Sequence, residues 1–292
     1  MTRAQTRLMP GGQVKLSMYY EYGAIETCKN VVAGTVKNAI AVIRPPGHHA
    51  KSEKAMGFCF LNNIAITARV CQADFPKTCH KVLILDWDIQ HGNGTQNIFY
   101  SDPDVLCTSV HVSEKGSFYP SHPHNMAGSD GGLENVGAGT GIGRNINIPW
   151  GAQGMGDSEY VAAFQRIIMP IAREFNLDLV IVAAGFDAAD GDNPGGCFVS
   201  PECFAYMTHM TMASTTVAIC CCRFSSRSSW MSIMVASVTK EMNHWIPENG
   251  TFTDLRGDSD EEPDRPRRLR GHDSKRDDIL RGSDGGEHAA YG

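Results

Sequence analysis

The sequence predicts an α/β fold with three layers, in which a mostly parallel sheet is flanked by helices. Three observations predict it. Apolar runs without polar alternation recur along the chain, as strands buried on both faces require. Stretches with apolar residues at helical spacing separate these runs. Polar clusters follow several runs directly, and in such sheets ligands bind beyond the carboxyl ends of the strands.

The individual elements follow from hydrophobic period and from turn residues. Strands are expected at 38–43, 81–88, 105–112, 145–150 and 177–186, and helices at 60–72, 157–175 and 200–210. Pro170 should kink or break the second helix, because proline has no backbone N–H. Ser200 is expected to cap the third helix, with Pro201 at its first position.

Composition and charge exclude several classes of protein. The chain has 292 residues and a formal net charge of -6, which argues against direct nucleic-acid binding through a broad basic face. No apolar run reaches the roughly 18 residues of a membrane span, and no secretory signal is recognisable at the start. The cysteines lack CxxC spacing and sit in apolar stretches, which indicates reduced thiols and a nuclear or cytoplasmic protein.

Acidic residues gather where strands are expected to end. Asp86, Asp88 and Gln90 share one face of the strand, and Asp187 supplies another carboxylate at the end of a second strand. Carboxylates so close would repel unless a cation or a histidine lay between them. Oxygen and nitrogen ligands around an open position are typical of a catalytic zinc or a similar divalent ion. The alternative is that these acids only cap neighbouring backbone amides.

His48 and His49 follow a Pro-Pro-Gly turn at the end of the first expected strand. Two histidines beside acids and a metal-bound water form the layout of metal-assisted hydrolysis, in which the metal lowers the pKa of the water and a histidine takes its proton.

Five segments together resemble a known family: RPPGHHA, GFCFLNN, LDWDIQHGNGTQ, SVHVSEKGSFYP and AGFDAADGDNPGG. They are similar to the zinc-dependent histone deacetylases, and most of all to the class II, yeast-like branch of the arginase/deacetylase fold. The resemblance runs from about Gly23 to Met212. It implies an amidohydrolase that removes acetyl groups from lysine side chains of histones or other proteins, and thereby a chromatin regulator that represses transcription.

The resemblance also implies roles for individual residues. It assigns Asp88, Gln90 and Asp187 to the metal, His48, His49, Asp86 and Asn93 to catalysis, Gly57, Phe58 and Tyr119 to the substrate tunnel, and Asp86 and Ser109 to a structural potassium ion. His49 would be the general base and His48 its electrostatic partner, with Asp86 and Asn93 orienting the two rings. The implied cofactors are Zn²⁺ and K⁺. The implied partners are acetylated histone tails or other acetylated proteins, with a corepressor complex.

The sequence departs from the family's pattern at three places. Gln90 stands where the family has a histidine, and an amide oxygen is a poorer zinc ligand than an imidazole nitrogen. No Gly-Gly-Tyr loop is recognisable after Met212, since Tyr206 falls on an expected helix and Tyr291 near the end of the chain. The family's opening segment is also unrecognisable. We therefore expect a deacetylase core with both flanks missing or replaced.

Four segments are expected: an unmatched stretch at 1–22, the deacetylase-like core at 23–212, a divergent segment at 213–250, and a disordered tail of mixed charge at 251–292. Three functions come into question. The first is lysine deacetylation. The second is a catalytically impaired deacetylase-like module that acts as a binding or scaffold protein. A ureohydrolase of the same broad fold is disfavoured, because the acids and histidines for two manganese ions are too few.

Overall fold

The computed structural model of the chain describes residues 11–120, 130–192, 195–213 and 217–222, with side chains from residue 22 to residue 220. The chain divides into two compact units, residues 1–252 and 253–292, and every described residue lies in the first. The tail expected at 251–292 and residues 223–250 lie outside the described residues.

The described part contains a sheet whose neighbouring strands all run parallel. Its strands are β1 (Asn38–Ile43), β2 (Val82–Asp86), β3 (Val105–Val112), β4 (Asn145–Trp150), β5 (Leu179–Ala184) and β6 (Val217–Cys222), in the spatial order β1-β6-β5-β2-β3-β4. β1, β3 and β4 have the expected bounds, and β2 and β5 are shorter than expected. β6 was missed, because its run of cysteines hides the hydrophobic period of a strand.

The α-helices are α1 (Gly11–Val32), α2 (Asn63–Asp74), α3 (Asn93–Phe99), α4 (Asp157–Ala163), α5 (Met169–Phe175) and α6 (Pro201–Met212), and a π-helical segment η4 (Phe164–Ile168) joins α4 to α5. Two short 3₁₀ helices, η2 (Glu114–Gly116) and η3 (Gly139–Gly141), complete the set. The helix expected at 157–175 is interrupted just before Pro170, because proline cannot donate the hydrogen bond that would continue it. Ser200 caps α6 as expected, accepting a hydrogen bond from the backbone N–H of Cys203. No described helix is long and apolar enough to cross a membrane.

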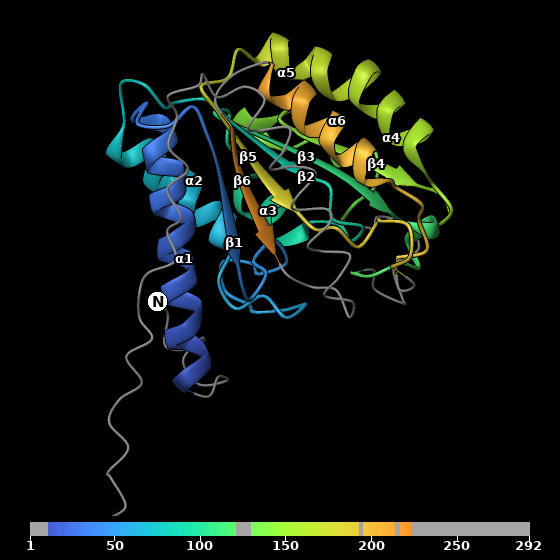
Figure 1. Cartoon of the computed structure of the whole chain (residues 1–292), viewed down its shortest axis with the longest axis horizontal. Helices are drawn as coiled ribbons and strands as arrows, with labels where there is room; N and C mark the ends of the chain where they lie inside the picture. Colours follow the sequence, from blue (N-terminus) through green and yellow to red (C-terminus); the bar gives the residue numbers. More distant parts are fainter. Residues whose placement is uncertain (1–10, 121–129, 193–194, 214–216, 223–292) are drawn as a thin grey trace, which may run out of the picture. The chain divides into compact units, whose positions relative to one another are not determined.

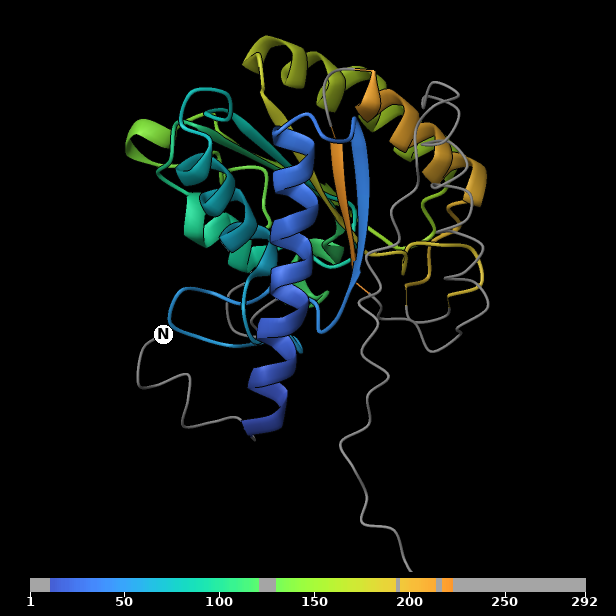
Figure 2. The same cartoon turned by 60° about the vertical axis from the view of Figure 1, so that its left-hand side comes forward.

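Helices cover both faces of the sheet, as the sequence predicts (Figures 1 and 2). α4, α5 and α6 lie on one face, and α1, α2 and α3 on the other. β2 shows why its sequence is apolar throughout: Leu83 and Leu85 enter the core under α4–α6, whereas Val82 and Ile84 enter the core under α1 and α2. A strand buried on both faces has no position left for a solvated polar side chain.

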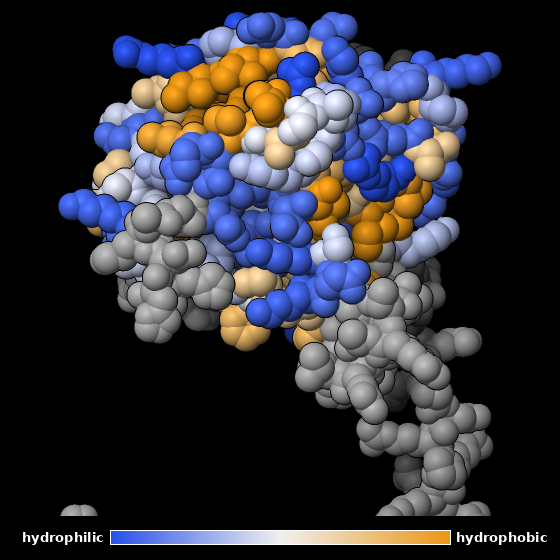
Figure 3. Space-filling view, turned by 180° about the vertical axis from the view of Figure 1, so that it is seen from behind, coloured by the Kyte–Doolittle hydropathy of each residue, from blue (hydrophilic) through white to orange (hydrophobic). Residues whose placement is uncertain are grey.

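Regular structure extends beyond both expected ends of the core. α1 runs across residue 22, and β6 follows residue 212 and pairs with β1 and β5. Within the described part β1 is an outermost strand, and its Val42 is 54% exposed. Hydrophobic side chains also form patches on the face seen from behind (Figure 3). Exposed apolar side chains of this kind are common where a sheet edge or a helix face contacts another part of a protein.

Candidate active site

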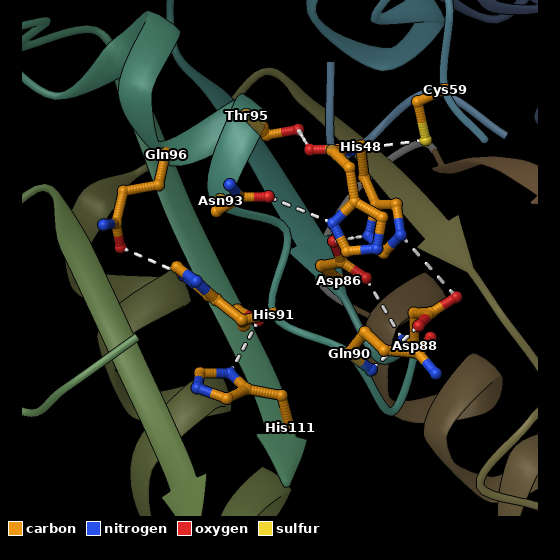
Figure 4. Close-up of polar contacts among 12 residues, drawn as sticks. His48, Cys59, Asp86, Asp88, Gln90, His91, Asn93, Thr95, Gln96 and His111 are labelled. Atoms are coloured by element: carbon orange, nitrogen blue, oxygen red, sulfur yellow. Dashed lines mark hydrogen bonds and ion pairs between the residues drawn. The ribbon is translucent and has the colours of Figure 1, made fainter. Parts of the chain in front are cut away.

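Three loops meet at the carboxyl edge of the sheet, as the sequence predicts. His48 and His49 follow β1, Asp86 ends β2 with Asp88 just after it, and Asp187 follows β5. Because parallel strands present their carboxyl ends at the same edge, residues up to 139 positions apart in the sequence can come together. Figure 4 shows His48, Asp86, Asp88, Gln90 and Asn93 gathered at this point.

His48 lies between two carboxylates. Its Nδ1 is 2.8 Å from Oδ2 of Asp86, and its Nε2 is 3.8 Å from Oδ2 of Asp88 (Figure 4). Burial disfavours the charged imidazole, but the negative charges of Asp86 and Asp88 outweigh burial and raise the pKa of His48 to about 9. His48 therefore carries a positive charge at neutral pH. The other oxygen of Asp86 accepts a hydrogen bond from the backbone N–H of Asp88, at 3.1 Å, which fixes that carboxylate.

His49 has a different partner and is neutral, whereas His48 is charged. Its Nδ1 is 3.0 Å from Oδ1 of Asn93, the first residue of α3. Burial, with the nearby charge of His48, lowers the pKa of His49 to about 2, so this ring is neutral. An amide oxygen can only accept, hence Nδ1 carries the hydrogen and Nε2 keeps a free lone pair. The two rings stack with their centroids 3.9 Å apart, and so a charged and a neutral imidazole stand side by side.

Asp88 and Asp187 are both buried and lie close enough to perturb each other. Burial raises the pKa of Asp88 to about 6, partly opposed by His48. Burial and the charge of Asp88 together raise the pKa of Asp187. One oxygen of each carboxylate accepts a backbone hydrogen bond: Oδ1 of Asp88 from Gln90 and Oδ1 of Asp187 from Ile89, both at 2.9 Å. The capping role that was the alternative therefore uses Oδ1 of each acid, while Oδ2 of Asp88 faces His48.

The donors at this point do not complete a zinc site. Among the residues whose side chains are described, no three His, Cys, Asp or Glu residues are arranged to hold a metal ion. Gln90 lies beside Asp88 (Figure 4) and brings an amide in place of an imidazole. His91 faces the other way: its Nε2 is 3.1 Å from Oε1 of Gln96, and its ring lies 4.6 Å from the ring of His111. Two carboxylates and an amide do not fit the nitrogen-containing ligand set that is usual for catalytic zinc.

Two of the three residues expected in the tunnel, Gly57 and Tyr119, pack against His49, and Phe58 follows Gly57 at the surface. Gly57 has a φ of 56°, and a Cβ there would overlap the His49 ring and lie 2.6 Å from Oη of Tyr119. The Tyr119 ring packs edge-on against His49, with 5.0 Å between centroids. Phe58 also has a positive φ, of 61°, and its side chain is 70% exposed. Two aromatic side chains at the surface beside a buried neutral histidine could contact an aliphatic stem whose end reaches His49.

Ser109 stands directly across the sheet from Asp86 in the β2–β3 pairing. Its hydroxyl lies 2.9 Å from Nδ1 of His111, whose Nε2 donates to the carbonyl of Gly131 at 3.0 Å. Ser109 and Asp86 are thus neighbours, as a shared potassium site requires, and that site stays a prediction. Tyr206 lies on α6, where its hydroxyl bonds Gln165 at 2.7 Å, while Tyr291 lies outside the described residues.

Sequence reasoning missed the glycines that allow this close packing. A Cβ on Gly92 would overlap Oδ2 of Asp86, and a Cβ on Gly185 would overlap Oδ2 of Asp88. It also missed Gln96, whose Oε1 accepts hydrogen bonds from Asn145 and Asn147 at 2.7 and 2.9 Å. The glycines in DWDIQHGNG and AAGFDA were a visible signal, because glycine inside such clusters often marks a close backbone approach.

The chain matches the family model described as "Histone deacetylase domain" over residues 5–224. It is 54% identical over 189 residues to histone deacetylase clr3 of Schizosaccharomyces pombe, covering 65% of this chain and 27% of that protein. It is 48% identical over 198 residues to histone deacetylase HDA1 of Saccharomyces cerevisiae, covering 68% and 27%, and 49% identical over 187 residues to human histone deacetylase 7, covering 62% and 19%.

Two solved structures are similar. The crystal structure of the HDA15 HD domain has a TM-score of 0.72 and 38% identity, covering 78% of this chain and 61% of that chain. The structure of the histone deacetylase Clr3 has a TM-score of 0.69 and 41% identity, covering 87% and 42%. The chain spans between about a fifth and a quarter of the length of these curated relatives.

Proposed function

Because this chain belongs to the histone deacetylase domain family, in its class II branch, we propose that it hydrolyses the acetyl amide of acetyl-lysine side chains in proteins. We place the deacetylase-like core at residues 23–212. The observation that carries the proposal is the histidine pair, a charged His48 beside a neutral His49, each held by its own partner. Two titratable groups whose surroundings drive their pKa values apart are the usual mark of an acid–base pair.

The pair divides the work of amide hydrolysis. His49 takes a proton from the attacking water at Nε2 and later gives it to the departing lysine amine. His48, held as an imidazolium by Asp86, stabilises the negative charge that develops on the carbonyl oxygen. Asn93 fixes the tautomer of His49, since its amide oxygen needs an N–H at Nδ1.

The substrate stem is proposed to lie between Phe58 and Tyr119, and Gly57, which packs closely against His49 and Tyr119, is proposed to hold these two rings in place. Zinc is the cofactor that family membership implies, and a bound divalent ion supplies the Lewis acid of such reactions. The zinc position of this chain has an amide, from Gln90, in place of an imidazole. The roles given above are therefore those of the chain's own side chains and involve no metal ion. By the same membership we propose acetylated histone tails as substrates, potassium near Asp86 and Ser109, a corepressor complex as partner, and action in the nucleus as a repressor of transcription.

Hydrolysis of a fluorogenic acetyl-lysine peptide by the purified full chain, with Zn²⁺ or Mn²⁺ supplied, tests the proposal. His49→Ala should lower the rate by about 10²–10⁴-fold, the range for a lost general base. The matched control is His80→Ala, because His80 is an exposed histidine outside the site and its variant should keep full activity. Peptide binding without hydrolysis under either metal would overturn the proposal in favour of a binding module.

A further inference from the structure

We propose that the metal position of this chain is an all-oxygen site, made for a hard divalent cation such as Mn²⁺ or Mg²⁺ and not for zinc, and that Gln90 sets this preference. The inference rests on the proposed function in one respect only, because it places the ion between Asp88 and Asp187. It concerns which ion the chain holds and does not require that the chain hydrolyse any substrate.

The two carboxylates provide negative charge and oxygen ligands. Asp88 and Asp187 are 8% and 9% exposed, and each uses Oδ1 for a backbone hydrogen bond. Oδ2 of Asp88 has no backbone partner; it lies 3.8 Å from Nε2 of His48, on the side where the chain after β5 approaches at Gly185. Both carboxylates are buried at the same edge of the sheet, and buried carboxylates are usually paired or bound to a metal ion.

The Nδ1 atoms of the two histidines and the thiol of Cys59 have protein partners. Nδ1 of His48 is bonded to Asp86, and Nδ1 of His49 to Asn93. Nε2 of His48 lies 3.8 Å from Oδ2 of Asp88, and Nε2 of His49 is the proton acceptor of the proposed reaction. The thiol of Cys59 bonds the carbonyl of Gly57 and accepts from the backbone N–H of His49, both at 3.4 Å. Cys59 is therefore held by backbone groups and does not face the carboxylates as a free ligand.

His91 cannot replace the missing imidazole. Its ring packs against the ring of His111, with 4.6 Å between the centroids. Its Nε2 bonds Gln96, and Gly131 packs against its ring so closely that a Cβ there would lie 3.0 Å from Cγ. Turning His91 toward Asp88 would break these contacts.

The remaining candidate ligand is the side-chain amide oxygen of Gln90. Gln90 follows the end of β2 and lies beside Asp88, to which its backbone N–H donates a hydrogen bond (Figure 4). Carboxylate and amide oxygens suit Mg²⁺, Ca²⁺ and Mn²⁺, whereas imidazole nitrogen suits zinc. Where all ligands are oxygen atoms, the affinity of zinc exceeds that of Mg²⁺ or Mn²⁺ by much less than it does at a site with a nitrogen ligand. The ion that occupies it is then decided by availability, which favours Mg²⁺ and Mn²⁺.

Calorimetric titration of the metal-free full chain with Zn²⁺ and with Mn²⁺ tests this inference without any activity measurement. Gln90→His should raise the zinc affinity by at least about 10-fold. Mutations of residues that only support metal ligands already change metal affinity by about 10–100-fold, and a change of the ligand itself should do no less. The Mn²⁺ affinity should change much less, so the ratio of the two dissociation constants should shift by about 10-fold or more in favour of zinc.

Two variants serve as controls. Gln165→His adds a histidine at an exposed position outside the site and should leave both affinities unchanged. Asp88→Asn should abolish the binding of either ion, which locates the ion at this site. A zinc-to-manganese ratio that Gln90→His leaves unchanged, or zinc that copurifies at one ion per chain, would overturn the inference. Failure of the proposed function would appear differently, as absent hydrolysis with every metal.

Discussion

Nδ1 of His49 lies 3.0 Å from the side-chain oxygen of Asn93. This histidine is therefore positioned by a neutral amide, whereas its neighbour His48 is positioned by a carboxylate. The difference decides the charge of the two rings, since a carboxylate stabilises an imidazolium and an amide oxygen does so far less. Two adjacent residues of one type thus acquire different protonation states from partners in β2 and α3.

Asn93→Asp should move His49 toward the behaviour of His48. A carboxylate at this position raises the pKa of His49, and more of the enzyme is then protonated and inactive at low pH. The acidic limb of the profile of kcat/KM against pH should shift upward by about one unit or more. The matched control is Asn97→Asp, an exposed position on the same helix α3, for which no shift is expected.

Gly185→Ala should damage the site from the side of β5. The new methyl group would overlap Oδ2 of Asp88, and so that carboxylate must move away from Asp187. We expect Mn²⁺ affinity, measured by calorimetry, to fall by about 10-fold or more, as for other losses of ligand support. Gly151→Ala is the control, because nothing lies within 4 Å of a Cβ at Gly151. Equal metal affinity in both variants would contradict the placement of Asp88.

Trp87 joins the site to the larger core. It is fully buried between Asp86 and Asp88, with ring centroids 6.4 Å from Phe164 and 6.0 Å from Phe204. Trp87→Ala should lower the free energy of unfolding in urea by about 3–5 kcal/mol. Trp87→Phe should cost about half as much or less, because Nε1 of Trp87 has no hydrogen-bond partner to lose. Similar losses in the two variants would mean that the indole N–H is bonded after all.

The buried His111 should make stability depend on pH. Burial lowers its pKa from 6.5 to about 4, so the folded state keeps it neutral over that range. Between pH 6.5 and about 4 the unfolded chain binds a proton that the folded chain does not. Stability from this residue is therefore complete above pH 6.5 and is lost as pH falls, by at most about 1.4 kcal/mol per pH unit.

Comparison of the wild type with His111→Gln isolates this contribution from those of the other titrating groups. In urea denaturation at pH 7.5, 6.5 and 5.5, chosen on the order of one unit apart, the wild type should lose more stability on acidification than the variant does. Parallel losses in the two proteins would show that His111 is already protonated, or solvated, in the folded state.

The sequence by itself determined the α/β class, the five strands with regular apolar runs, the break at Pro170 and the edge at which the polar loops meet. These features depend on local period and turn chemistry, which a single segment carries.

Only the tertiary structure decided which partner each histidine has, and hence which of them is charged. That choice depends on β2 and α3, 38 and 44 residues further along the chain, and no local pattern encodes distances between separate loops. It also decided that 217–222 is a strand, since its place between β1 and β5 outweighs the weak preference of its own residues. The close approaches at Gly92 and Gly185 likewise exist only once separate loops are packed together.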